Sequence, residues 1–210
     1  MAKITGSKCR VCRRSGEKLF LKGLRCTTKK CPVERGIGAP GQHIKRRMRM
    51  TDYGQHLREI QRAKHLYGLL MRQFTRFFHE ANRLSGDTGD NLLILLERRV
   101  DTVLMRLGFA FSRAHARQMV VHGHVRVNGR RVRSPSQILK AGDTIEPMAR
   151  DRSRKHIKDT YALAKEMLSP PSYLRIEAED PLRAVMTQEP KREDISVPFD
   201  PLAVVEYMSQ

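Results

Sequence analysis

The chain has 210 residues, with 41 lysines and arginines against 22 aspartates and glutamates, for a net charge of +19. Its longest unbroken apolar run, Leu92 to Leu96, is far shorter than the roughly 20 residues of a membrane-spanning helix, and its first residues lack an apolar stretch typical of a secretory signal. We therefore expect no membrane association and a cytoplasmic location. An acidic metabolite does not require so large a positive field, so nucleic acid is the expected partner.

The positive charge is concentrated toward the amino terminus. Residues 1–50 contain 15 basic and 2 acidic side chains, residues 51–150 contain 17 and 9, and residues 151–210 contain 9 and 11. A basic excess can simply keep a chain soluble, but fifteen charges in fifty residues repel one another and destabilise a compact state that has no counter-charge. The distribution therefore favours phosphate contacts from the first 150 residues.

All four cysteines lie near the amino terminus, as Cys9-x2-Cys12 and Cys26-x4-Cys31 separated by thirteen residues. Two such pairs are typical of a tetrahedral four-thiolate site, and metal ligation would supply the folding energy of a segment too small and too charged to bury a core. Disulfides and unused thiols are the alternatives, and a cytosolic chain keeps its thiols reduced. We predict Zn²⁺ at these cysteines, with an iron–sulfur cluster as the alternative cofactor.

A segment dense in glycine and proline, residues 36–43, precedes a basic cluster that contains Arg46, Arg47 and Arg49. Regular structure is not expected where glycine and proline are this frequent. The cluster indicates either an electrostatic contact for single-stranded or irregular nucleic acid or a solvated loop.

Apolar residues at three- and four-residue steps predict two long helices, over residues 53–84 and 90–107. Thr51 or Asp52 is positioned to cap the first of them. In the carboxyl-terminal part, the pattern predicts a further helix and two short strands that pack back on the core. These elements are expected at residues 150–168, 173–176 and 202–207, respectively.

Between these parts, the sequence predicts a short helix followed by a hairpin. Ser112 is expected to cap a helix over residues 113–122, and Asn128-Gly129 is typical of a type I′ hairpin turn. The amino end of this helix offers backbone N–H groups, a hydroxyl and a guanidinium as an anion site, and arginines at i and i+4 could grip neighbouring phosphates. A single arginine is more often a solvated surface residue. The predicted RNA-binding side chains are Ser112, Arg113, Arg117, His122, His124, Arg126 and Asn128.

Several stretches resemble a known family. Ser112-Arg113-Ala114-His115-Ala116-Arg117-Gln118 and Val127-Asn128-Gly129-Arg130 resemble the RNA-binding module named after the fourth protein of the small ribosomal subunit. Ala39-Pro40-Gly41-Gln42-His43 and Gly86-Asp87-Thr88-Gly89-Asp90-Asn91-Leu92-Leu93 resemble the bacterial ribosomal protein S4 family itself, and the cysteine set resembles its metal-binding form.

The resemblance implies a structural, non-catalytic component of the small ribosomal subunit that is a primary binder of 16S rRNA and initiates subunit assembly. It also implies contact with protein S5, with S3 nearby, and a contribution to translational accuracy. Arg46, Arg47 and Arg49 match basic positions that face mRNA in the channel through which it enters the ribosome. A free homo-oligomer is not expected.

The predicted fold class is α+β: a mostly helical body with a basic metal-binding amino-terminal extension and an inserted RNA-binding module of two helices and a β-hairpin. The extension is expected at residues 1–50, the body at 51–97 and 150–210, and the module at 98–149.

Two other classes of protein contain the same module. A pseudouridine synthase has an aspartate motif to which Arg99-Val100-Asp101 is faintly similar, but the downstream residues do not match and no length remains for a catalytic domain. A free stress or recycling factor would not be expected to need the cysteines and the Gly-Gln-His segment as well.

Overall fold

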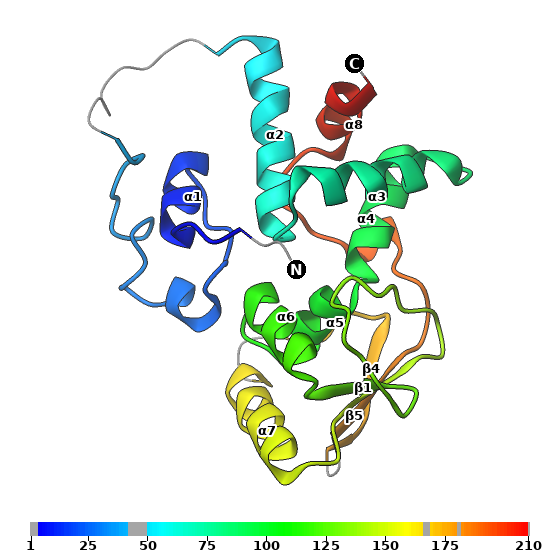
Figure 1. Ribbon diagram of the computed structural model, residues 1–210. Helices are drawn as coiled ribbons and strands as arrows, with labels where there is room; N and C mark the ends of the chain where they lie inside the picture. Colours follow the sequence, from blue (N-terminus) through cyan, green and yellow to red (C-terminus); the bar gives the residue numbers. More distant parts are fainter. Residues whose placement is uncertain (1–3, 42–49, 166–168, 180–181, 210) are drawn as a thin grey trace. The chain divides into compact units, whose positions relative to one another are not determined.

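The computed structural model describes residues 4–41, 50–165, 169–179 and 182–209. They form two compact units, Met1–Leu93 with Val197–Gln210 and Ile94–Ser196 (Figure 1). Helices together with an antiparallel sheet confirm the α+β class. Among the described residues, no helix is long and apolar enough to cross a membrane. The predicted mRNA cluster of Arg46, Arg47 and Arg49 lies outside them.

The first unit is helical. Ile60, Phe74 and Phe78 are buried in it, and the Thr51 hydroxyl accepts a hydrogen bond from the backbone N–H of Gly54, which confirms the predicted cap. Its elements are α1 (Lys8–Ser15), the 3-10 helix η1 (Gly23–Thr27), α2 (Asp52–Leu66), α3 (Met71–Arg83), most of α4 (Thr88–Glu97) and α8 (Pro201–Ser209).

The single helix predicted over residues 53–84 is wrong, because the chain forms α2 and α3 with a break between them. Gly68 adopts a φ of +65°, the left-handed conformation that commonly ends a helix, and the Leu69 N–H returns to the Lys64 carbonyl. Leu70 is then extended before α3 begins. The apolar periodicity continues across the break because α2 and α3 each bury one apolar face.

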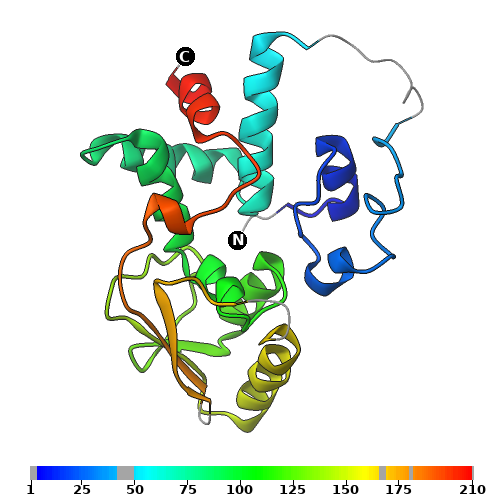
Figure 2. The same ribbon diagram turned by 180° about the vertical axis from the view of Figure 1, so that it is seen from behind.

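The strand predicted over residues 202–207 is also wrong, since this segment is α8. The Asp200 carboxylate accepts the Leu202 N–H, and Pro201 occupies the first helical position, where its missing N–H costs nothing. Figure 2 shows α8 alongside α2, and Val204 is fully buried. A short apolar run does not distinguish a strand from a buried helix by periodicity alone, which explains the error.

The second unit contains a five-stranded antiparallel sheet in the order β2-β1-β3-β5-β4. The two carboxyl-terminal strands extend the sheet started by the hairpin, because β5 pairs with β3. Its elements are α5 (Val100–Arg106), α6 (Arg113–His122), β1 (Val125–Val127), β2 (Arg130–Arg131), β3 (Thr144–Pro147), α7 (Asp151–Lys165), β4 (Leu174–Glu179), β5 (Leu182–Met186) and the 3-10 helix η2 (Arg192–Asp194).

One apolar core joins the helices of this unit to the sheet. Leu104, Phe109, Val125, Ile157 and Met186 are all within it and at most 1% exposed. Because the core draws on α5, β1, α7 and β5 together, the helix predicted over residues 150–168 and the strand predicted over 173–176 belong to the same compact unit as the hairpin.

The helix predicted over residues 90–107 is interrupted where α4 gives way to α5. Arg99 is extended and pairs with Ile138 in an isolated β-bridge, while the Leu139 N–H donates to the Arg98 carbonyl. The Arg99 side chain is fully buried and donates two hydrogen bonds to Asp101, at 2.9 and 2.6 Å. The break therefore places a buried arginine, paired with Asp101 in the first turn of α5, between two helical segments whose apolar patterns are continuous in the sequence.

Candidate nucleic-acid interface and cysteine cluster

The short helix at the centre of the predicted RNA site forms where the sequence places it. The Ser112 hydroxyl accepts the N–H of His115 at 3.3 Å, and Gly123 ends α6 with a φ of +74°. A Cβ at Gly123 would collide with the guanidinium of Arg131. The left-handed helix end is what favours glycine here, because the Arg131 guanidinium is the far end of a flexible side chain and could move aside.

The hairpin prediction is also confirmed. Asn128 and Gly129 both have positive φ, +49° and +72°, as a type I′ turn requires, and Val127 is paired with Arg130. The Asn128 amide donates to Asp143 at 2.8 Å and accepts from the backbone N–H of Thr144 at 2.8 Å. The Asn128 side chain, which the sequence predicts to bind RNA, therefore holds the hairpin turn to Asp143 and to the first residue of β3.

The two arginines predicted to grip phosphates are turned toward buried carboxylates. Arg113 lies 3.5 Å from Glu97 and donates toward the Thr102 hydroxyl at 3.4 Å, and only 11% of its side chain is exposed. Arg117 lies 3.9 Å from Asp101. These guanidiniums compensate buried charge, a role that the local sequence pattern does not indicate.

Glu97 is the centre of this charge network. It is fully buried, accepts two hydrogen bonds from Arg106 at 2.9 Å each, and accepts the Tyr173 hydroxyl at 3.1 Å. Burial and the negative charge of Glu97 raise the pKa of Tyr173 above its ordinary value, so this hydroxyl remains a donor. The network joins the end of α4, α5, α6 and the residue that precedes β4 within the second unit.

The remaining predicted site residues lie near the hairpin with differing exposure. His122 is exposed, whereas His124 is half-buried with its Nδ1 atom 2.9 Å from the Ser153 hydroxyl. Arg126 lies 3.3 Å from Glu146, a neighbour across the β1–β3 ladder. His122 is thus open to a partner, and Arg126 is engaged within the sheet.

Sequence reasoning missed a set of exposed cations that no carboxylate neutralises in the part of the chain that the structure describes. Two flank the hairpin, and four lie in or next to the first turns of α7. Dense basic spacing around residue 152 is the signal that indicates the four near α7, whereas the pattern of the sequence predicts only a helix there. These residues are Arg130, Arg133, Arg150, Arg152, Arg154 and Lys155.

The four cysteines meet around one small cavity of about 20 Å³. Cys9 and Cys12 come from α1, Cys26 from η1 and Cys31 from the turn that follows, and all four are free thiols. Burial raises the pKa of Cys12 and Cys26, and negative charge on the other cysteines would raise it further, so a cation would favour their thiolates. Among the described residues, no three potential ligands already have a metal-binding arrangement.

Known proteins match the chain along its whole length. The family described as "Ribosomal protein S4/S9 N-terminal domain" matches residues 3–97, and the "S4 domain" matches residues 98–145. "Small ribosomal subunit protein uS4" of Halothermothrix orenii is 45% identical over 210 residues, and that of Pelotomaculum thermopropionicum is 47% identical, each with full coverage of both chains. The uS4 protein of Geobacter sp. (strain M21) is 45% identical over 211 residues.

The chain belongs to the uS4 family. Members of this family are small-subunit ribosomal proteins rather than enzymes, which agrees with the predicted structural role. Within the uS4 chain, the S4 domain contains α5, α6, the hairpin and the start of β3, so its charge network and its exposed cations lie in or next to the matched domain.

Proposed function

We propose that this protein is a structural component of the cytoplasmic small ribosomal subunit and binds 16S rRNA there. Full-length similarity to uS4 proteins is the observation that carries the proposal. The net charge of +19 and the exposed cations around the hairpin and α7 supply the electrostatic attraction that a folded RNA requires.

Sedimentation after a high-salt wash tests this function. The protein, expressed with a small tag, should remain on small subunits in a one-to-one ratio at about 0.5 M salt, because a structural component contacts many phosphates at once. Complete loss into the soluble fraction would instead indicate a free RNA-binding factor. Conversion of uridine to pseudouridine within a 16S rRNA transcript would indicate an enzyme.

The finer role proposed is that of a primary binder, which initiates subunit assembly, contacts S5 with S3 nearby, and contributes to translational accuracy. We further propose that Arg46, Arg47 and Arg49 face mRNA as it enters the ribosome. The support is that the Gly-Gln-His segment and the basic residues after it resemble the family and lie within residues 3–97, which match the ribosomal S4/S9 amino-terminal domain. Replacing the three arginines with alanine should leave assembly intact and slow translation through a stable mRNA hairpin. Normal passage through the hairpin would contradict this role.

For the RNA site, we propose contacts from the start of α6 at Ser112 and from the exposed His122. Arg113, Arg117 and Arg126 would add contacts through the guanidinium N–H groups that do not face their carboxylate partners. His124 is half-buried, and the Asn128 side chain is hydrogen-bonded to Asp143. Both would therefore contact RNA only at the margin of this face. Arg130 and Arg133 extend it along the hairpin, where their exposure favours phosphate contact.

We also propose that Cys9, Cys12, Cys26 and Cys31 bind Zn²⁺, with an iron–sulfur cluster as the alternative. The donor set fits, because four thiols border one cavity, and a bound cation would stabilise the thiolates that burial disfavours. Ligation would hold α1 and η1 together in a segment with little apolar core, and Lys8 and Lys22 at the cavity would offset the charge of the thiolates.

Metal analysis of the purified protein distinguishes these outcomes. One zinc per chain without visible absorbance is expected. Bound iron with visible absorbance would instead indicate the iron–sulfur cluster. Fewer than about 0.1 atoms of either metal per chain, in protein purified without chelator, would contradict the site. Cys12→Ser should lower the bound metal, and Ser15→Ala, on the same helix outside the cavity, is the matched control.

A further inference from the structure

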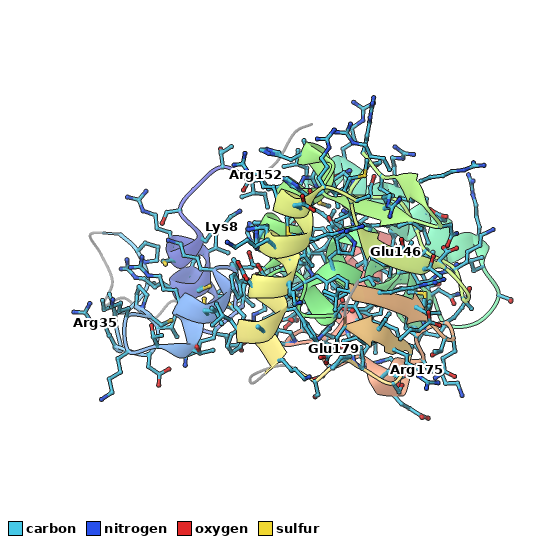
Figure 3. The ribbon with its side chains drawn as sticks, turned by 90° about the horizontal axis from the view of Figure 1, so that it is seen from below. Lys8, Arg35, Glu146, Arg152, Arg175 and Glu179 are labelled. Carbon is cyan, nitrogen blue, oxygen red and sulfur yellow. The ribbon has the colours of Figure 1, made fainter. Side chains whose placement is uncertain are left out.

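A cavity of about 330 Å³ opens beside α7, in the second unit. His124 lines it from the chain leading into β1, and the other lining residues are Arg152, Lys155, His156 and Asp159 of α7. Figure 3 shows Arg152 at one end of α7, well separated from Arg175 of β4 in the same unit. The cavity is distinct from the predicted anion site at the start of α6, which is formed by Ser112 and Arg113.

The charge of this cavity is not balanced from within. In the described part of the chain, Arg152 and Lys155 form no ion pair, and Asp159 is the single carboxylate of the lining. Two fixed cations against one anion leave the lining positive even when both of its imidazoles are neutral. By contrast, Arg113 and Arg117 face Glu97 and Asp101.

Four imidazoles lie next to one another at the cavity, and two of them are hydrogen-bonded. The Nε2 atoms of His115 and His156 are 3.1 Å apart, so one must donate and the other accept, and the two rings cannot both be fully protonated in this arrangement. His124 lies with its ring centroid 6.3 Å from that of His156, and His122 lies 6.1 Å from His124. Phe111 stacks on His115 from the other side.

These surroundings disfavour protonated histidine in the free protein. Burial lowers the pKa of His115, and the neighbouring His156 adds to the effect. Burial also lowers the pKa of His124, and so does positive charge on His156, His122, Arg152 and Arg150. An anion placed among these groups would oppose every one of the charge effects, and it would therefore raise both pKa values.

We infer that the cavity beside α7 binds a phosphodiester of the RNA backbone, held by Arg152 and Lys155, and that binding is coupled to proton uptake by the adjacent histidines. The inference rests on the proposed rRNA-binding function. A phosphodiester keeps a single negative charge across the physiological pH range, so any pH dependence arises from the protein. The proton-linked gain in affinity is present below the raised pKa of the bound state and is lost as the pH increases through it.

The experiment measures the affinity of the full chain for a 16S rRNA transcript between pH 5.5 and 8 and at several salt concentrations. Wild-type affinity should increase severalfold as the pH falls, by no more than about tenfold per pH unit for one proton. Arg152→Ala/Lys155→Ala should weaken binding roughly tenfold and lower the log–log salt slope by about one. Arg175→Ala/Lys191→Ala removes the same charge away from the cavity and is the matched control.

A second variant isolates the proton coupling. His115→Gln/His156→Gln keeps hydrogen-bonding side chains but removes two of the titratable rings, so the pH dependence of transcript affinity should decrease, with His124 accounting for what remains, while binding at pH 8 is retained. Circular dichroism of each variant shows whether it is folded. If the glutamine variant does not fold, His124→Gln is used for the same measurement.

The outcomes separate this inference from the function on which it rests. A wild-type chain that ignores the transcript at moderate salt contradicts rRNA binding itself. A wild-type chain that binds, together with an Arg152→Ala/Lys155→Ala variant that binds like the control, or a glutamine variant with an unchanged pH profile, overturns the cavity alone. Saturable shifts of the histidine ring protons with inorganic phosphate, without any loss of transcript affinity in the cavity variant, would assign the cavity to free phosphate and would also overturn the inference.

Discussion

On α6, both arginines turn toward buried carboxylates, whereas on α7 Arg152 and Arg154 have no carboxylate within ion-pair distance among the described residues. The two helices belong to one compact unit and carry similarly basic sequences. The difference lies in what each helix packs against: α6 meets the Glu97 and Asp101 network, and the first turns of α7 meet imidazoles and solvent. A basic residue can therefore stabilise the fold or remain available for RNA, and its neighbours in space decide which.

The largest expected effect comes from breaking the buried ion pair between Arg99 and Asp101. Asp101→Ala removes the bidentate partner of the fully buried Arg99 guanidinium, and it should lower the free energy of unfolding by about 3–5 kcal/mol. Urea unfolding monitored by circular dichroism measures the change. Asp159→Ala, an exposed carboxylate on α7, is the control and should change stability by less than about 0.5 kcal/mol. Equal effects of the two substitutions would show that the buried pair contributes no more than a surface charge.

Next comes the double substitution on α6. Arg113→Ala/Arg117→Ala leaves Glu97 and Asp101 with fewer cations, so unfolding should become easier by about 2–3 kcal/mol. Binding to 16S rRNA should weaken as well, and the salt slope divides the causes: a slope lowered by about two indicates direct phosphate contacts. An unchanged slope in a folded variant would restrict these arginines to the structural role.

The comparison also shows which features the sequence could reveal. Local signals were sufficient for α6, for the Asn128-Gly129 turn and for the grouping of the cysteines, because caps, turn residues and short spacings act over a few positions. The breaks at Gly68 and Arg99 were missed because apolar periodicity continues across them.

Contacts between distant parts of the chain were beyond such reasoning. Glu97 contacts Tyr173, 76 positions away, and His115 contacts His156, 41 positions away. Both pairs depend on α7 and the segment before β4 packing against the same core, so no local spacing in the sequence indicates them. The inward turn of Arg113 has the same origin, since its partner Glu97 lies on another helix.

A smaller effect is expected at the helix cap that both structural and RNA-binding roles require. Ser112→Ala removes the side-chain acceptor for the His115 N–H, and it should lower the free energy of unfolding by about 1 kcal/mol. Thermal unfolding followed by circular dichroism would detect this. Ser112→Asn keeps a capping acceptor and should restore most of the loss, whereas equal losses in both variants would mean that the hydroxyl acts in another way.

The smallest effect on stability, combined with a clear effect on RNA, is expected at the hairpin. Arg130 and Arg133 are exposed and have no ion-pair partner in the described ranges, so Arg130→Ala/Arg133→Ala should change the free energy of unfolding by less than about 0.5 kcal/mol. Affinity for 16S rRNA should nevertheless fall, with the salt slope reduced by about two, because exposed guanidiniums contribute mainly through released counterions. Filter binding across a salt series and urea unfolding of the same preparations give both quantities. A loss of stability as large as that of the α6 double variant would remove the distinction between cations that serve the fold and cations that serve the partner.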